Sequence, residues 1–128
     1  MWEIDVLVER VEGARLDEKV NESSPSNYSL NVSMQERGRD PQSLVLGFAL
    51  ELTSEPQLGR LVVNGIATIT GSKEEINKVT TAPDDKNPPI ILLTIYERVY
   101  GLLYQISGEL KIPHPKPNLL KPSEGKEK

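Results

Sequence analysis

Residues 44–52 read Leu-Val-Leu-Gly-Phe-Ala-Leu-Glu-Leu, with a large apolar side chain at every second position. An alternation with a period of two is typical of a β-strand that buries one face and leaves the other accessible. This segment therefore predicts a strand with one strongly apolar face. The residues predicted to face the core are Leu44, Leu46, Phe48, Leu50 and Leu52.

The same alternation occurs on both sides of this segment. It runs over residues 28–34 and 61–69, and polar turn sequences separate both runs from residues 44–52. Residues 2–8 form a further alternating run, and a change of phase at Val11 predicts a β-bulge. Because short connections join antiparallel neighbours, we predict a four-stranded antiparallel β-meander.

Helical signals follow the fourth strand. Ser72 and Glu75 have the spacing of a capping box at the start of a short helix over residues 73–79. Residues 90–107 predict one long helix that ends before Gly108, a residue type common just beyond helix ends. The predicted fold class is therefore α+β: a four-stranded antiparallel β-meander followed by a short helix and one long apolar helix packed on the sheet.

The long helix is apolar around most of its circumference. Its polar residues form one narrow stripe that includes Thr94, Glu97 and Gln105. One sheet face cannot cover so wide an apolar surface, and the charged, short run does not fit a membrane span. We therefore predict that the helix also packs on a partner subunit of a homo-oligomer, a dimer or tetramer. The residues predicted at this oligomer interface are Tyr96, Val99, Tyr100, Leu102, Leu103 and Ile106.

Composition limits the available chemistry. The chain of 128 residues contains no cysteine and a single histidine, His114. Disulfides, thiolate nucleophiles and Cys-ligated zinc are therefore excluded, and we predict no metal, no cofactor and no enzymatic activity. His114 lies between two prolines, and Asp84 and Asp85 lie together in a polar loop. We interpret all three as solvated surface residues rather than catalytic groups or metal ligands.

Charge and the N-terminal sequence bear on partners and location. The net charge is −4, and no basic patch of the kind that binds nucleic acid is present. Acidic residues follow the first methionine, where a secretion signal would carry basic ones. We expect a cytoplasmic protein that does not bind nucleic acid, with one domain over residues 1–120 and a disordered tail over residues 121–128.

The second face of the third and fourth predicted strands carries small or β-branched apolar residues. A single helix layer leaves this face uncovered. Three interpretations stay open: a peptide-binding surface, a subunit contact, or tolerated apolar exposure. The residues of this hypothetical client-binding surface are Val45, Ala49, Val62 and Ile66.

Two segments near the C-terminus resemble those of a known family. Residues 89–98 place a proline and five aliphatic residues ahead of Tyr96 and Arg98, and residues 107–113 combine a glycine and a proline at the helix exit. Together with the order of strands and helices, these segments resemble the SecB export chaperone family. The resemblance extends over most of the chain as a pattern of elements.

The resemblance implies a SecB-like fold that binds polypeptide clients without a cofactor. Members of that fold also act as general or antitoxin-associated chaperones, so the resemblance implies client binding more than export. We therefore predict a holdase chaperone that binds unfolded or extended apolar polypeptide. Two alternatives stay open. One is a carrier or enzyme with a small hydrophobic-ligand cavity between sheet and helix, lined by the hydroxyls of Tyr96, Tyr100 and Tyr104. The other is a structural subunit of a larger assembly.

Overall fold

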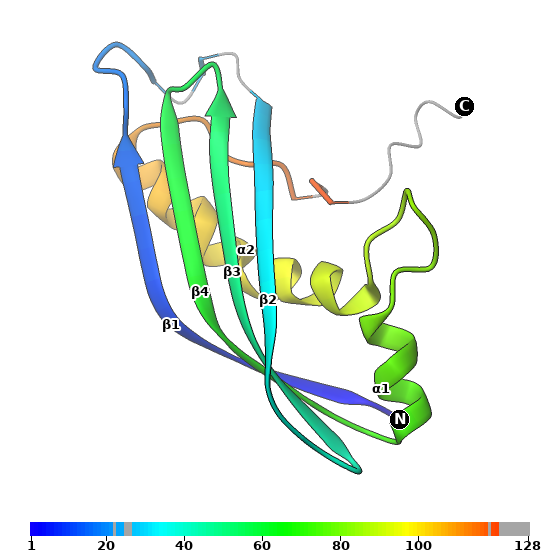
Figure 1. The fold of residues 1–128 in the computed structure, drawn as a ribbon. Helices are drawn as coiled ribbons and strands as arrows, with labels where there is room; N and C mark the ends of the chain where they lie inside the picture. The colour runs from blue at the N-terminus through cyan, green and yellow to red at the C-terminus, as the bar shows by residue number, and fades with distance from the viewer. Residues whose placement is uncertain (22, 25–26, 118, 121–128) are drawn as a thin grey trace.

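The computed structural model describes residues 1–21, 23–24, 27–117 and 119–120 (Figure 1). Within these residues a four-stranded antiparallel sheet is followed by a short helix and a long helix that packs on the sheet. The predicted fold class is confirmed, whereas the predicted tail over residues 121–128 lies outside the described residues. The elements are β1 (Glu3–Arg15), β2 (Asn27–Asp40), β3 (Ser43–Glu55), β4 (Gly59–Thr70), α1 (Lys73–Thr80) and α2 (Ile90–Leu110).

The order of the strands departs from a simple meander at one point. β2, β3 and β4 are consecutive antiparallel neighbours, but β1 pairs with β4, so that the order is β1-β4-β3-β2. The connection over residues 16–26 is long enough to pass the ends of the other strands, whereas a tight turn at Pro41 and Gln42 joins β2 to β3. β4 is thereby paired on both edges, and β1 and β2 form the edges of the sheet.

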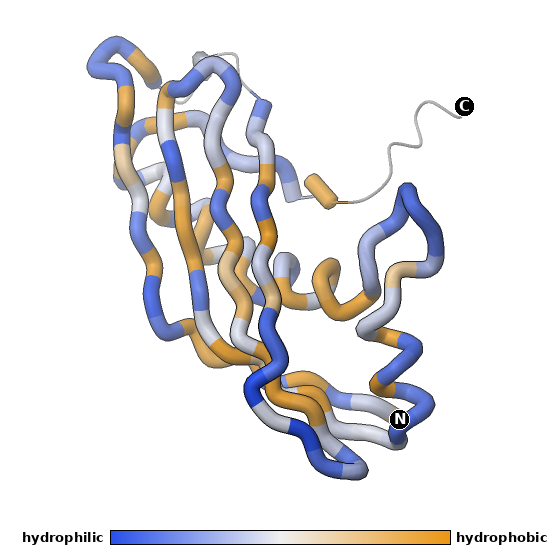
Figure 2. Tube along the Cα trace, viewed as in Figure 1, coloured by the Kyte–Doolittle hydropathy of each residue, from blue (hydrophilic) through white to orange (hydrophobic). Residues whose placement is uncertain are grey.

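One face of the sheet carries the core, as the alternation predicts. The five predicted side chains of β3 are all buried, and so are the matching ones of β4. Helix α2 crosses this face behind the sheet and packs mainly against β1 and β4, while α1 lies against β3 at the lower end (Figure 1). Figure 2 shows the resulting alternation of apolar and polar segments along the strands. The buried residues of β4 are Leu61, Val63, Ala67 and Ile69.

The bulge in β1 lies at Glu9, two residues before the predicted position at Val11. The pairing with β4 shifts immediately after Val8. Gly65 makes this shift possible, because a Cβ atom there would overlap the carbonyl oxygen of Leu7 and lie 2.9 Å from the Cα of Val8. Glycine at this position lets the bulged backbone approach β4 closely.

Both helices have defined ends. At the start of α1 the predicted capping box is present: Ser72 Oγ accepts from the Glu75 amide at 3.1 Å, and Glu75 Oε1 accepts from the Ser72 amide at 3.0 Å. The prediction that α2 ends before Gly108 is wrong. The helix continues to Leu110, and Lys111 then adopts a left-handed conformation with φ of 57°.

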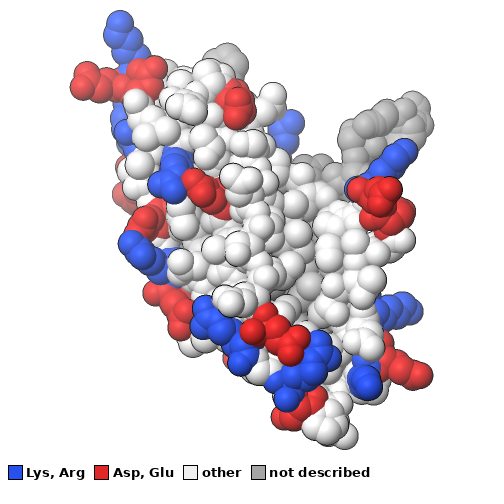
Figure 3. Space-filling model, in the orientation of Figure 1, with Lys and Arg blue, Asp and Glu red and all other residues white. Residues whose placement is uncertain are grey.

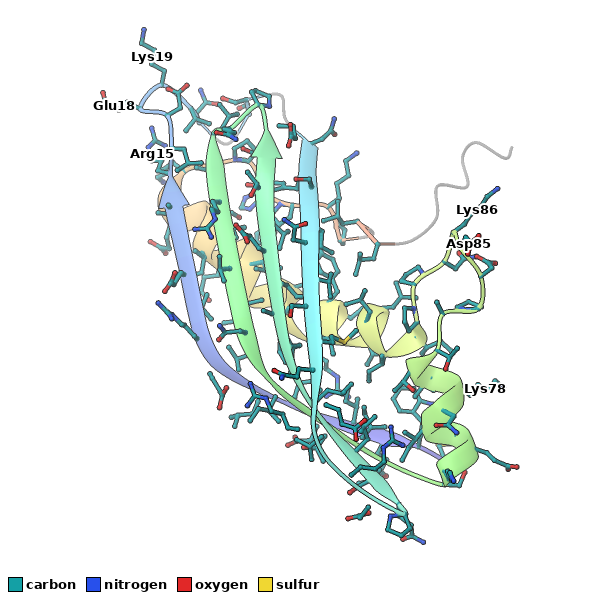
Figure 4. All side chains as sticks on the ribbon, in the orientation of Figure 1. Arg15, Glu18, Lys19, Lys78, Asp85 and Lys86 are labelled. Carbon is teal, nitrogen blue, oxygen red and sulfur yellow. The ribbon has the colours of Figure 1, made fainter. Side chains whose placement is uncertain are left out.

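The additional turn of α2 depends on a contact with β1. Arg15 Nη1 donates to the carbonyl oxygens of Leu110 at 3.0 Å and Lys111 at 3.1 Å. Figure 4 shows Arg15 at the upper end of β1, close to where α2 ends. A cation is favourable at the carbonyl end of a helix, so this tertiary contact stabilises a turn that the local sequence does not predict.

Beyond α2 the chain forms a C-terminal strap, residues 111–117. It passes behind the upper part of the sheet, from the side of β1 toward β2 (Figure 1). Ile112, Pro113 and Pro115 are buried. Ile112 packs so closely against Gly59 at the start of β4 that a Cβ atom there would lie 3.2 Å from Ile112 Cγ2. The strap is therefore part of the packed fold.

Candidate functional site

The four residues predicted to bind clients lie on the outer face of the sheet, opposite α2. Val45, Ala49, Val62 and Ile66 alternate with the buried residues of β3 and β4, and each is partly exposed. No helix covers this face within the described chain. Figure 3 views the molecule from this side and shows few charged side chains near the middle of the sheet, with more along β1 and at the lower end.

Leu7 extends this face, and the sequence analysis did not identify it. Leu7 pairs with Ile66 across β1 and β4, and 57% of its surface is exposed. On the other side of Ile66 the neighbour is Gly47, which offers no side chain. The signal in the sequence was an apolar residue among the acidic positions of the first strand. The Leu7–Ile66 pair is therefore the most exposed apolar feature of the outer face.

Polar groups divide the rest of this face. Val62 pairs with Glu51, and Arg60 Nε donates to Glu51 Oε2 at 2.6 Å. Beside Ala49, a hollow of about 190 Å³ is lined mainly by polar side chains, Arg37 and Asn64 among them. This volume is below the roughly 300 Å³ of typical small-molecule sites. The four predicted residues thus share a face without forming one continuous apolar groove.

A row of tyrosines lies on the other side of the sheet. Tyr96, Tyr100 and Tyr104 follow one another along α2, with ring centroids 5.8 and 6.2 Å apart. The hydroxyl of Tyr96 donates to the carbonyl of Lys116, and that of Tyr100 to the carbonyl of Pro115, both at 2.7 Å. The alternative of a ligand cavity relied on the hydroxyls of Tyr96, Tyr100 and Tyr104, and the first two of these instead bind the strap.

Tyr28 on β2 completes the set of tyrosines that hold the strap. Its hydroxyl donates to the carbonyl of Pro113 at 2.6 Å. Burial raises the pKa of Tyr28 to about 12. Burial, with a contribution from neighbouring tyrosines, also raises the pKa values of Tyr96 and Tyr100. All three phenols therefore stay protonated, and able to donate, well above neutral pH.

We expect the free energy of unfolding to fall as the pH rises from about 10 to 12. The folded pKa of Tyr28 lies above its ordinary value of 10.0, so the folded state keeps a proton that the unfolded state releases. This stabilisation is complete below pH 10 and is lost as the pH rises through the folded pKa, at about 1.4 kcal/mol per pH unit. Urea unfolding followed by circular dichroism at several pH values measures how the free energy of unfolding changes with pH. The free energy of unfolding should depend less on pH in Tyr28→Phe than in wild type. An identical pH dependence would contradict this role of the Tyr28 phenol.

His114 is not the exposed surface residue that its neighbouring prolines suggested. Its ring stacks on Tyr104 with centroids 3.8 Å apart and planes 5° from parallel. His114 Nδ1 lies 2.6 Å from Ser107 Oγ. Ser107 Oγ also donates to the carbonyl oxygen of Tyr104 at 2.8 Å. The pair fastens the strap to α2.

The Ser107–His114 pair does not have the geometry of a catalytic pair. Ser107 is completely buried, so a substrate atom has no access to its Oγ. Asp84, the other candidate from the sequence, accepts hydrogen bonds from the amides of Lys86 and Asn87, which lower its pKa. Asp85 and Lys86 lie at the tip of this loop (Figure 4). Within the described residues, no cluster of three or more carboxylates and histidines could hold a metal ion.

The strap also changes which residues of α2 reach the surface. Of the six residues predicted at an oligomer interface, Tyr96, Val99 and Leu103 are buried within the chain. Tyr100 and Ile106 are partly exposed, and Leu102 is 37% exposed. Tyr104, which was not assigned to the interface, is 51% exposed. The chain itself therefore buries half of the six residues that were predicted to contact a partner.

The sequence matches no family model and no curated protein. Among solved structures, the fold is similar to that of a Mycobacterium tuberculosis SecB-like chaperone, Rv1957. That chaperone was solved in complex with a ChAD peptide from the Rv1956 HigA1 antitoxin. The two chains are 13% identical with a TM-score of 0.56, and the match covers 88% of this chain and 83% of that chain.

A second structure, of a Streptococcus agalactiae protein of unknown function, is 17% identical with a TM-score of 0.42 and covers 89% of this chain and 95% of that one. The likeness to the SecB-like chaperone shows a shared fold, as the resemblance in the sequence predicts. None of the helices in the described part of the chain is long and apolar enough to span a membrane.

Proposed function

We propose that this chain is a non-catalytic, SecB-like holdase that binds unfolded or extended apolar polypeptide. The fold that it shares with a chaperone solved with a bound peptide supports this proposal. The observation that carries it is the uncovered outer face, where Leu7 and Ile66 form an exposed apolar pair between two antiparallel strands. Burial of such side chains by an extended client would stabilise the complex without a cofactor.

Replacing Val62 and Ile66 together by serine should weaken client binding about tenfold or more, because each change removes apolar surface and adds a polar group. Binding of a fluorescently labelled, unfolded protein measures the affinity, and suppression of its aggregation measures the activity. Salt should have little effect on the wild-type affinity, since apolar burial dominates.

Leu16→Ser is a matched control for this double variant. Leu16 is 47% exposed but follows β1 at the end of the sheet, so its replacement should leave client binding unchanged. Equal affinity of wild type and the double variant would place the client elsewhere. Failure of the wild-type chain to bind or protect any unfolded protein would refute the holdase function itself. Homo-oligomerisation and a cytoplasmic location stay predictions.

A further inference from the structure

The C-terminal strap is bound in the manner of a peptide ligand. Three phenol hydroxyls from two separate elements donate to carbonyl oxygens of the strap at 2.6–2.7 Å: Tyr28 to Pro113, Tyr100 to Pro115 and Tyr96 to Lys116. We call the surface formed by Tyr28, Tyr96, Tyr100 and Tyr104 the tyrosine groove. Every one of these hydrogen bonds ends on a backbone carbonyl, a group that any polypeptide can offer.

The part of the strap that lies in the tyrosine groove is rich in proline. Pro113 and Pro115 are buried, and the only side chain between them, His114, stacks on Tyr104. A row of aromatic rings with hydroxyl donors suits an extended proline-containing segment, because proline rings pack on aromatic faces and such a segment needs no amide partners at its prolines. The groove therefore selects for backbone conformation and proline content rather than for charge.

We propose that the tyrosine groove binds an extended, proline-containing segment of another polypeptide, and that the strap is a displaceable internal competitor for it. The inference rests on the proposed function insofar as the ligand is a polypeptide client. Arg15 and the burial of Ile112, Pro113 and Pro115 hold the start of the strap. Its other contacts are hydrogen bonds from neutral hydroxyls and one ring stack, which are individually weak. Lys111, with its left-handed backbone, marks the point at which the strap leaves α2.

The test uses the full chain with its strap weakened. Pro113→Gly combined with Pro115→Gly removes both buried rings from the strap and leaves the tyrosine groove unchanged. Because His114 is the single histidine, its two ring carbon-bound protons give resolved NMR signals that the Tyr104 ring displaces while the strap is bound. In the variant these signals should move to the chemical shifts of a histidine in an unstructured peptide. A synthetic peptide with the sequence of residues 111–117 is the probe.

This peptide should bind the variant about tenfold or more tightly than it binds wild type, in which the strap must first be released. Adding Tyr100→Phe to the variant should weaken peptide binding about threefold to tenfold, because one hydrogen bond is lost. A peptide with glycine in place of its first two prolines is the matched control and should bind more weakly. Equal affinity of the peptide for wild type and variant would overturn the inference.

A second variant keeps the test decisive if the double proline variant does not fold. His114→Ala removes the strap's own contacts with Ser107 and Tyr104 and leaves both residues free to contact the histidine of the peptide. It should also bind the peptide more tightly than wild type does. Two outcomes separate this inference from the proposed function. Peptide binding without suppression of aggregation would refute the holdase, whereas suppression of aggregation by a strap variant that does not bind the peptide would refute the tyrosine groove.

Discussion

Leu103→Glu should reduce the free energy of unfolding by about 4 kcal/mol or more, and it should prevent folding if the wild type is of ordinary stability. Leu103 has no exposed surface and lies within the core between α2 and the sheet. Removing a buried leucine already costs about 2–5 kcal/mol, and a carboxylate at this site would lose its hydration without a partner. Urea unfolding followed by circular dichroism, or the yield of soluble protein, provides the measurement.

Leu102→Glu is the matched control because it places the same charge one residue earlier, where 37% of the side chain is exposed. We expect the stability of the single chain to change little. If α2 contacts a second copy of the chain through Leu102 and Tyr104, this variant should lower the solution mass measured by light scattering. A wild-type chain that is monomeric at micromolar concentration would contradict the predicted oligomer.

Phe48→Ala is expected to lower the free energy of unfolding by about 3–5 kcal/mol, the range for aromatic truncations in a core. Phe48 is 3% exposed and occupies the middle of the core face of β3. The midpoint of urea unfolding should fall. The m value, which is the dependence of the unfolding free energy on urea concentration, should stay constant because the surface exposed on unfolding changes little.

Val45→Ala provides the comparison for Phe48→Ala. Val45 lies on the outer face of the same strand and is partly exposed, so its truncation should cost less than about 1 kcal/mol. A shift of one residue in the register of β3 would exchange the two faces and reverse the order of these effects. Equal stability of Phe48→Ala and wild type would therefore contradict the register of the sheet.

Local patterns predicted the elements of this protein well. The core face of β3, the capping box at Ser72 and Glu75, and the outer position of Val62 and Ile66 depend on residues close together in the sequence. The alternation of a strand and the spacing of a cap are local properties, so a single sequence is sufficient to identify them.

Features that depend on long-range contacts were predicted less well. The alternation in β1 does not show which strand it joins, and the pairing with β4 follows from packing across the sheet. Helix α2 ends later than predicted, beyond Gly108, because Arg15, which is far away in the sequence, binds the last carbonyl of the helix. Leu7 was overlooked because the acidic residues around it dominate its face of the strand.

The sequence by itself determined an α+β domain with four alternating strands, a capped short helix and a long helix too apolar for one sheet face to cover. Only the tertiary structure decided what covers that helix. The left-handed turn at Lys111 directs the strap back across the core face, where its carbonyls accept hydrogen bonds from Tyr28, Tyr96 and Tyr100. The proline-rich sequence of the strap carries no periodicity, so its place depends on partners that only the folded chain brings together.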